Sequence, residues 1–161
     1  MFRITHYIQE LLHPTPLQPV RKPPGPVVVW NLSRRCNLTC KHCYSTSADV
    51  TFPGELATQE IFTVMADLKA FQVPVLILSG GEPLLRPDIF VISHHAKQLG
   101  FYVALSTNGT TINQDNIEQI AAVNYDYVGV SLDGIGKTHD KFRQKTGAFD
   151  QALCGIRHCR D

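Results

Sequence analysis

The sequence predicts an α/β fold in which four β-α units build a parallel sheet. Short runs of β-branched and apolar residues alternate with segments in which apolar residues recur at helical spacing. A polar motif also lies at or after the end of each strand-like run, at residues 36–43, 79–83, 106–109 and 131–134. Because the carboxyl ends of parallel strands meet at one edge of a sheet, we expect four loops to converge on one face.

The four strands are expected over residues 27–31, 75–78, 102–106 and 127–132. Each run is too short to be a helix of typical length, and helical segments separate the runs. Strands joined in this way need right-handed crossovers, so the sheet should be parallel and its strands buried on both faces.

Four helices are expected, one after each strand, which makes the order βαβαβαβα. Thr58 is expected to cap the first helix. Pro87 suits the first position of the second helix, and Gly100 suits the position that closes it. The apolar faces of the four helices consist of Ile61, Val64, Met65, Leu68 and Phe71; Ile89, Ile92, Ala96 and Leu99; Ile117, Ile120 and Ala121; and Phe149, Leu153 and Ile156.

Residues 1–26 are expected to form a separate unit, and residues 27–161 the core domain. The unit begins with a short helix whose apolar residues fall on one face, and it continues as an arm that holds six of the ten prolines. Four β-α units are too few to close a barrel, and no turn signal precedes Asp161. We therefore expect the chain to be the N-terminal part of a longer protein.

The composition excludes several classes of function. The chain has 161 residues, with 15 Lys and Arg against 14 Asp and Glu, and no cluster of basic residues that would bind nucleic acid. Its apolar runs are far shorter than the roughly 18 residues needed to span a membrane, and its start does not read as a signal peptide. The odd number of cysteines, five, favours a reducing compartment over a disulfide framework. The prediction is a cytoplasmic protein without nucleic-acid or membrane partners.

Three of the five cysteines are crowded into eight positions after the first strand: Cys36, Cys40 and Cys43. A [4Fe–4S] cluster is compatible with three thiolates if its fourth iron takes an external ligand. Zinc prefers four protein ligands in structural sites, and the candidates for the fourth are His42, Cys154 and Cys159. The spacing favours the cluster, and a zinc site or buried free thiols stay as alternatives.

The Cys-x3-Cys-x2-Cys loop, followed by the Gly80–Pro83 motif Gly-Gly-Glu-Pro, resembles the radical S-adenosylmethionine (SAM) enzymes over residues 27–161. The resemblance implies the first four units of a partial (β/α)6 TIM-like barrel. It also implies that SAM chelates the open iron of a [4Fe–4S] cluster. One electron from the cluster then cleaves the sulfonium to methionine and a 5′-deoxyadenosyl radical.

The resemblance further implies which residues hold SAM. The main chain of the Gly80-Gly81 loop receives the methionine ammonium, and Glu82 helps to hold that loop. Ser131 and Arg143 match positions that bind the methionine carboxylate, for which the planar guanidinium is well suited. Two further candidates for SAM contacts come from the loop after the third strand: Ser106 and Asn108. No catalytic acid or base can be assigned.

Within this family the chain is most similar to the tetrapyrrole-modifying branch that serves haem d1 biosynthesis in denitrifying bacteria. The stretches that carry this similarity are residues 28–32, 34–45, 52–56, 73–90 and 125–134. The branch implies a didecarboxylated sirohaem as substrate, whose propionate side chains are altered by hydrogen abstraction. It also implies an electron donor such as a flavodoxin or ferredoxin, and a second iron–sulfur cluster in a C-terminal region. The alternatives are a radical SAM peptide maturase and a non-enzymatic zinc or iron–sulfur module.

Overall fold

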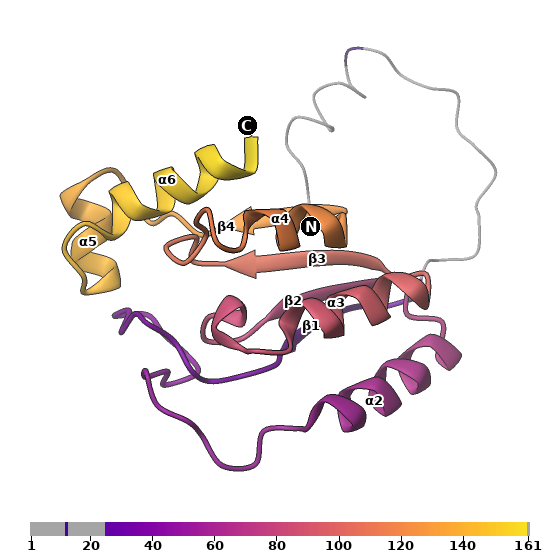
Figure 1. The fold of residues 1–161 in the computed structure, drawn as a ribbon. Helices are drawn as coiled ribbons and strands as arrows, with labels where there is room; N and C mark the ends of the chain where they lie inside the picture. The colour runs from indigo at the N-terminus through magenta and orange to yellow at the C-terminus, as the bar shows by residue number, and fades with distance from the viewer. Residues whose placement is uncertain (1–11, 13–24, 161) are drawn as a thin grey trace.

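The computed structural model describes residue 12 and residues 25–160, and these residues form the predicted parallel α/β architecture (Figure 1). The sheet has the order β1-β2-β3-β4, and every neighbouring pair is parallel. Sequence order and spatial order therefore agree, as expected for consecutive β-α units. The strands are β1 Val27–Asn31, β2 Val75–Ser79, β3 Tyr102–Thr107 and β4 Tyr127–Val130. The last strand ends two residues before its predicted end.

The structure contains the four predicted helices and two short additions, a 3-10 helix and a seven-residue α-helix. They are α2 Thr58–Ala70, the short 3-10 helix η1 Pro83–Leu85, α3 Ile89–Gln98, α4 Ile117–Val123, α5 Lys137–Arg143 and α6 Ala148–Arg160. The apolar repeats predict α2, α3, α4 and α6. They do not predict α5, because its seven residues include only one large apolar side chain, Phe142.

The start of α2 differs from the prediction. The N-cap is Ala57, whose amide donates to the Glu60 carboxylate at 2.8 Å, and Thr58 is the first residue of the helix. The Thr58 hydroxyl instead donates to Oδ2 of Asp88 at 2.6 Å. The predicted cap is therefore wrong, because a carboxylate at the start of α3 offers the threonine a charged acceptor.

Two further helix-end predictions are also corrected. Pro87 lies outside α3, because Asp88 is the N-cap and Ile89 the first helical residue. Phe71 does not share the buried face of α2, since it lies at the C-cap with 71% of its surface exposed. Gly100 does close α3 as predicted, and its φ of +75° is the left-handed conformation that glycine adopts at little cost.

The main core lies between one face of the sheet and the helices α2 and α3. It contains Leu32, Ile61, Met65, Val73, Leu76, Leu78, Ile89, Ile92, Ala96, Phe101 and Val103. The expectation that the strands are buried on both faces is wrong for β1, one of the two edge strands of the sheet. Val27 and Val29 are 50% and 58% exposed, while Val28 and Trp30 pack against the core from the other face.

The predicted helix and proline-rich arm lie outside the described residues, apart from residues 12, 25 and 26. The division of the chain at residue 26 therefore stays a prediction. Within the part of the chain that the structure describes, no helix has both the length and the apolar character needed to cross a bilayer.

Arg86 ties the loop after β2 to the loop after β1. Its buried guanidinium donates to both carboxylate oxygens of Asp88, and also to the carbonyl oxygens of Leu32 at 3.1 Å and Leu56 at 2.8 Å. Partial burial raises the pKa of Asp88, but hydrogen bonds from Arg86 and Thr58 outweigh it and hold this pKa below its ordinary value.

Asp88→Asn is expected to lower the free energy of unfolding by about 1–2 kcal/mol at pH 7, because a charged acceptor is lost from a largely buried arginine. The folded-state pKa of Asp88 is depressed, so its contribution is present above the unfolded-state pKa and is lost as the pH falls through the folded value. Urea unfolding of both proteins at pH 7 and at about pH 3 should show the difference shrinking in acid.

Asp49→Asn is the matched control, because Asp49 also pairs with an arginine, Arg35, but both side chains are about half exposed. This exposed pair is expected to contribute at most about 0.5 kcal/mol. An equal loss of unfolding free energy in Asp88→Asn and Asp49→Asn would contradict the role given to Asp88.

Candidate functional site

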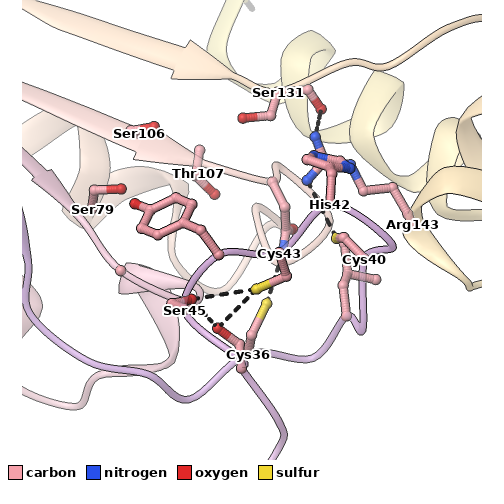
Figure 2. A pocket seen from close by; sticks show the side chains of 16 residues that line it. Cys36, Cys40, His42, Cys43, Ser45, Ser79, Ser106, Thr107, Ser131 and Arg143 are labelled. Carbon is pink, nitrogen blue, oxygen red and sulfur yellow. Dashed lines mark hydrogen bonds between the residues drawn. The ribbon is translucent and has the colours of Figure 1, made fainter.

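The four loops beyond the carboxyl ends of the strands meet at one edge of the sheet, as the sequence predicts. Figure 1 shows the loop after β1 and helix α5 at this same end. Between the loops lies a pocket of about 210 Å³ (Figure 2). It is lined by Cys36, Leu38, Cys40, His42, Cys43, Tyr44, Ser45, Ser47, Ser79, Gly80, Gly81, Ser106, Thr107, Asn108, Ser131 and Arg143. Nine of the ten predicted site residues are in this set, and Glu82 lies buried behind it.

Gly80 and Gly81 bring the loop after β2 into contact with the loop that carries the cysteines. The Gly81 amide donates to the carbonyl oxygen of Ser33 at 2.7 Å, and the Glu82 amide donates to that of Arg35 at 2.8 Å. A Cβ atom on Gly81 would lie 2.3 Å from the Arg35 oxygen, so no larger residue fits without a backbone shift. The glycines therefore position the cysteine loop.

Glu82 connects the loops after β2 and β3 from beneath the pocket. Its carboxylate is fully buried and accepts hydrogen bonds from the Thr107 hydroxyl at 2.7 Å, the Asn108 amide at 2.8 Å and the Leu84 amide at 3.1 Å. Burial raises the pKa of Glu82, while these donors oppose the rise. Since Glu82 does not line the pocket, its role is to hold the loops after β2 and β3 together.

Each of the three predicted metal-binding sulfurs has a polar partner from outside the Cys-x3-Cys-x2-Cys segment. The Asn108 carboxamide donates to Sγ of Cys36 at 3.8 Å, and Nη1 of Arg143 donates to Sγ of Cys40 at 3.6 Å. Sγ of Cys43 lies 3.3 Å from the hydroxyl of Ser45 (Figure 2). The pocket therefore offers a hydrogen-bonding group to every thiolate that would hold a cluster.

The surroundings shift the pKa values of two of these thiols, Cys36 and Cys43, in opposite directions. Burial raises the pKa of Cys36, which is only 6% exposed. Partial burial also raises the pKa of Cys43, but hydrogen bonds with Ser45 and Ser47 outweigh it and lower this pKa to about 7. Cys43 therefore loses its proton more readily than Cys36. The thiolate is the form that binds metal.

Arg143 comes from α5 and reaches across the pocket mouth. Nη2 donates to the carbonyl oxygen of Ser131 at 3.2 Å, and Nε forms an ion pair with Asp133. Figure 2 shows the guanidinium between Ser131 and Cys40. The Asp133 amide donates to Nδ1 of the buried His139, which fixes the loop after β4 to the start of the same helix. His139 and Arg143, four positions apart on α5, thus both contact Asp133, the first through its amide and the second through its carboxylate.

The predicted SAM contact Asn108 has its carboxamide engaged within the protein. Nδ2 donates to Sγ of Cys36 and, at 2.9 Å, to Oδ1 of Asn37. Oδ1 accepts from the amide and the hydroxyl of Thr110, at 2.9 and 2.7 Å. Ser106, which is half-buried, lines the same pocket without a hydrogen bond of this kind to the cysteine loop.

The donor set fits an iron–sulfur cluster better than a single ion. In residues 25–160 no three His, Cys, Asp or Glu side chains form a group that could hold one metal ion. A [4Fe–4S] cluster has a separate iron for each thiolate, so the sulfurs need not converge on one point. Cys154 and Cys159 are exposed on α6 and do not line the pocket, which removes two of the donors proposed for a zinc site.

The sequence does not single out four residues that the structure places beside the cysteines. Ser45 and Ser47 share a hydrogen bond of 2.6 Å under Cys43, Asn37 binds Asn108, and Arg34 donates to the carbonyl oxygen of Ser45 at 3.0 Å. For the two serines the sequence signal is the run of hydroxyl residues directly after the third cysteine. Such runs are common in loops, so the signal has little specificity.

This fold and this cysteine pocket define a class of protein: the chain belongs to the radical SAM superfamily, whose family model matches residues 30–161. Among curated proteins it is 53% identical to the pre-heme d1 synthase of Dinoroseobacter shibae over 99% of this chain and 40% of that protein. It is 45% identical to the Fe-coproporphyrin III synthase of Methanosarcina barkeri over 92% of this chain and 37% of that protein.

A solved structure, native anSMEcpe with bound AdoMet, shares the fold. It aligns with a TM-score of 0.64 and 21% identity over 82% of this chain and 39% of that chain. The chain spans about 40% of the length of the first of the curated relatives above. The predicted family and the predicted fold class are thus confirmed.

Proposed function

We propose that the protein is a radical SAM enzyme that modifies an iron-bearing tetrapyrrole during haem d1 biosynthesis. The observation that carries this proposal is the pocket in which three cysteines, the Gly80-Gly81 loop and Arg143 face one another. The similarity to the pre-heme d1 synthase of Dinoroseobacter shibae supports the tetrapyrrole as substrate class.

In this proposal Cys36, Cys40 and Cys43 hold a [4Fe–4S] cluster. When bound, that cluster supplies the single electron that cleaves the sulfonium of SAM to methionine and a 5′-deoxyadenosyl radical. The protein's own contribution is to fix the position of the thiolates, to orient SAM and to shield the site from water.

Arg143 and the Gly80-Gly81 loop are proposed to bind the carboxylate and the ammonium group at the α-carbon of the methionine moiety. The guanidinium pairs with the carboxylate, and Ser131 lies beside it on the loop after β4. An ammonium group only donates hydrogen bonds, so the carbonyl oxygens of the glycine loop are proposed to accept from it. The Gly81 amide is already bonded to the Ser33 carbonyl oxygen. Ser106 lines the same pocket.

The proposed substrate is a didecarboxylated sirohaem, and the proposed reaction is hydrogen abstraction from its propionate side chains. A cytoplasmic location, an external electron donor such as a flavodoxin or ferredoxin, and a second iron–sulfur cluster outside this chain belong to the same proposal. The alternative of a peptide maturase has less support, because the two curated relatives described above are both named for tetrapyrrole synthesis.

The test is to purify the full-length protein without oxygen and to incubate it with SAM, a reductant and sirohaem-derived substrates. We expect a brown protein with a broad absorbance at about 400 nm, and this absorbance should bleach on addition of dithionite. We also expect 5′-deoxyadenosine and a tetrapyrrole product of altered mass. A colourless protein with stoichiometric zinc would contradict the cluster. Turnover with a precursor peptide but not with the tetrapyrroles would favour the maturase.

A further inference from the structure

We propose that Asn108 is a positioning residue that holds the Cys36 thiolate and raises the reduction potential of the cluster bound there. This inference rests on the proposed function, because it assigns Asn108 a role toward the cluster. It differs from the expectation that Asn108 contacts SAM, which stays a prediction.

The orientation of the Asn108 carboxamide is fixed by its neighbours. The backbone amide of Thr110 can only donate, so the oxygen of the carboxamide must face it, at 2.9 Å. The NH2 group is therefore turned toward Sγ of Cys36 and Oδ1 of Asn37. Nδ2 of the Asn37 side chain in turn donates to the Thr110 hydroxyl at 2.9 Å, which closes the network.

This network leaves the Asn108 side chain no capacity for a further ligand. An asparagine carboxamide has two donor hydrogens and two acceptor lone pairs, and all four are used within the protein. Asn108 is also only 5% exposed, and its own amide is held by Glu82 at 2.8 Å. The side chain is therefore rigid and its donor permanently directed at the sulfur.

A donor directed at a cluster thiolate makes reduction easier. Adding an electron increases the negative charge on the cluster and its sulfurs, and a fixed N–H dipole stabilises that charge more strongly in a buried site than in water. Partners that hydrogen-bond to metal ligands tune the metal in this way. Asn108 thus links the loop after β3 to the redox property on which SAM cleavage depends.

The test compares the reduction potentials of the cluster in the full-length wild-type protein, Asn108→Asp and Asn108→Ala. Asn108→Asp keeps the oxygen that accepts from Thr110 but replaces the donor by a negative oxygen beside Cys36. The potential is measured anaerobically by dithionite titration in the presence of redox mediators, followed by electron paramagnetic resonance. Asn113→Asp is the matched control, because Asn113 is exposed and its Oδ1 accepts from the Asp115 amide in the same kind of turn.

For Asn108→Asp we expect at least a tenfold lower ratio of reduced to oxidised cluster at a fixed potential, which is about 59 mV for a one-electron couple. Asn108→Ala should show a shift of about threefold in the same direction, since it removes the donor without adding charge. Asn113→Asp should match the wild type. Wild-type potentials in both Asn108 variants would overturn this inference and leave the proposed function standing. A wild-type protein without a cluster would instead overturn the proposed function.

Discussion

Replacing Cys40 by alanine is expected to reduce the formation of 5′-deoxyadenosine from SAM to less than about 1% of the wild-type rate in the full-length protein. The physical reason is the loss of one of three thiolates, which leaves an iron without its protein ligand. Even the loss of a group that only supports a metal ligand typically lowers metal affinity or activity by about 10- to 100-fold. The measurement is anaerobic turnover with dithionite, with 5′-deoxyadenosine quantified by chromatography and the iron content determined in parallel.

Cys154→Ala is the control for that experiment. Cys154 is also a cysteine, but it is exposed on α6 and contacts His158 at 3.6 Å, away from the pocket. Its removal should leave iron content and turnover unchanged. Retained turnover in Cys40→Ala would contradict the assignment of the three cysteines as cluster ligands.

Arg143→Lys is expected to raise the KM for SAM by about 10- to 100-fold while the cluster content stays close to that of the wild type. Lysine keeps the positive charge, but it cannot bind a carboxylate through two parallel hydrogen bonds. It also cannot reach Asp133, Ser131 and Cys40 at once, as the three nitrogens of the guanidinium do. The measurement is the dependence of the rate of 5′-deoxyadenosine formation on SAM concentration.

Arg157→Lys provides the matched control, because Arg157 is exposed on α6 and does not line the pocket. Its KM for SAM should equal that of the wild type. If Arg143→Lys lowered kcat at an unchanged KM, the guanidinium would act on the chemical step and not on the binding of the SAM carboxylate.

The helices and strands that carry a clear apolar period were predictable from the sequence, and those without one were not. Ile61 and Met65 are buried on α2 as their spacing predicts. Helix α5 was missed, although it carries Arg143, because it is short and mostly polar. Its position depends on contacts such as that between the Lys41 amide and the Phe142 carbonyl oxygen, at 2.9 Å, which no local pattern encodes.

The predicted site residues lie together because the parallel topology carries them there. Polar loops after successive strands meet at one sheet edge, so the sequence could predict that Cys36, Gly81 and Ser131 lie close to one another. It could not predict that Gly81 packs against the cysteine loop, because the contact with the Arg35 carbonyl oxygen depends on the path of two separate loops.

By itself the sequence indicated the candidate site, through three thiols at close spacing, and the order of strands and helices along the chain, through local periodicity. Only the tertiary structure decided which donor serves which sulfur. Asn108 meets Cys36 across 72 positions of sequence, and Arg143 meets Cys40 across 103. Periodicity reports the preferences of neighbouring residues, whereas a hydrogen bond between distant loops depends on the packing that brings both loops to the same edge of the sheet.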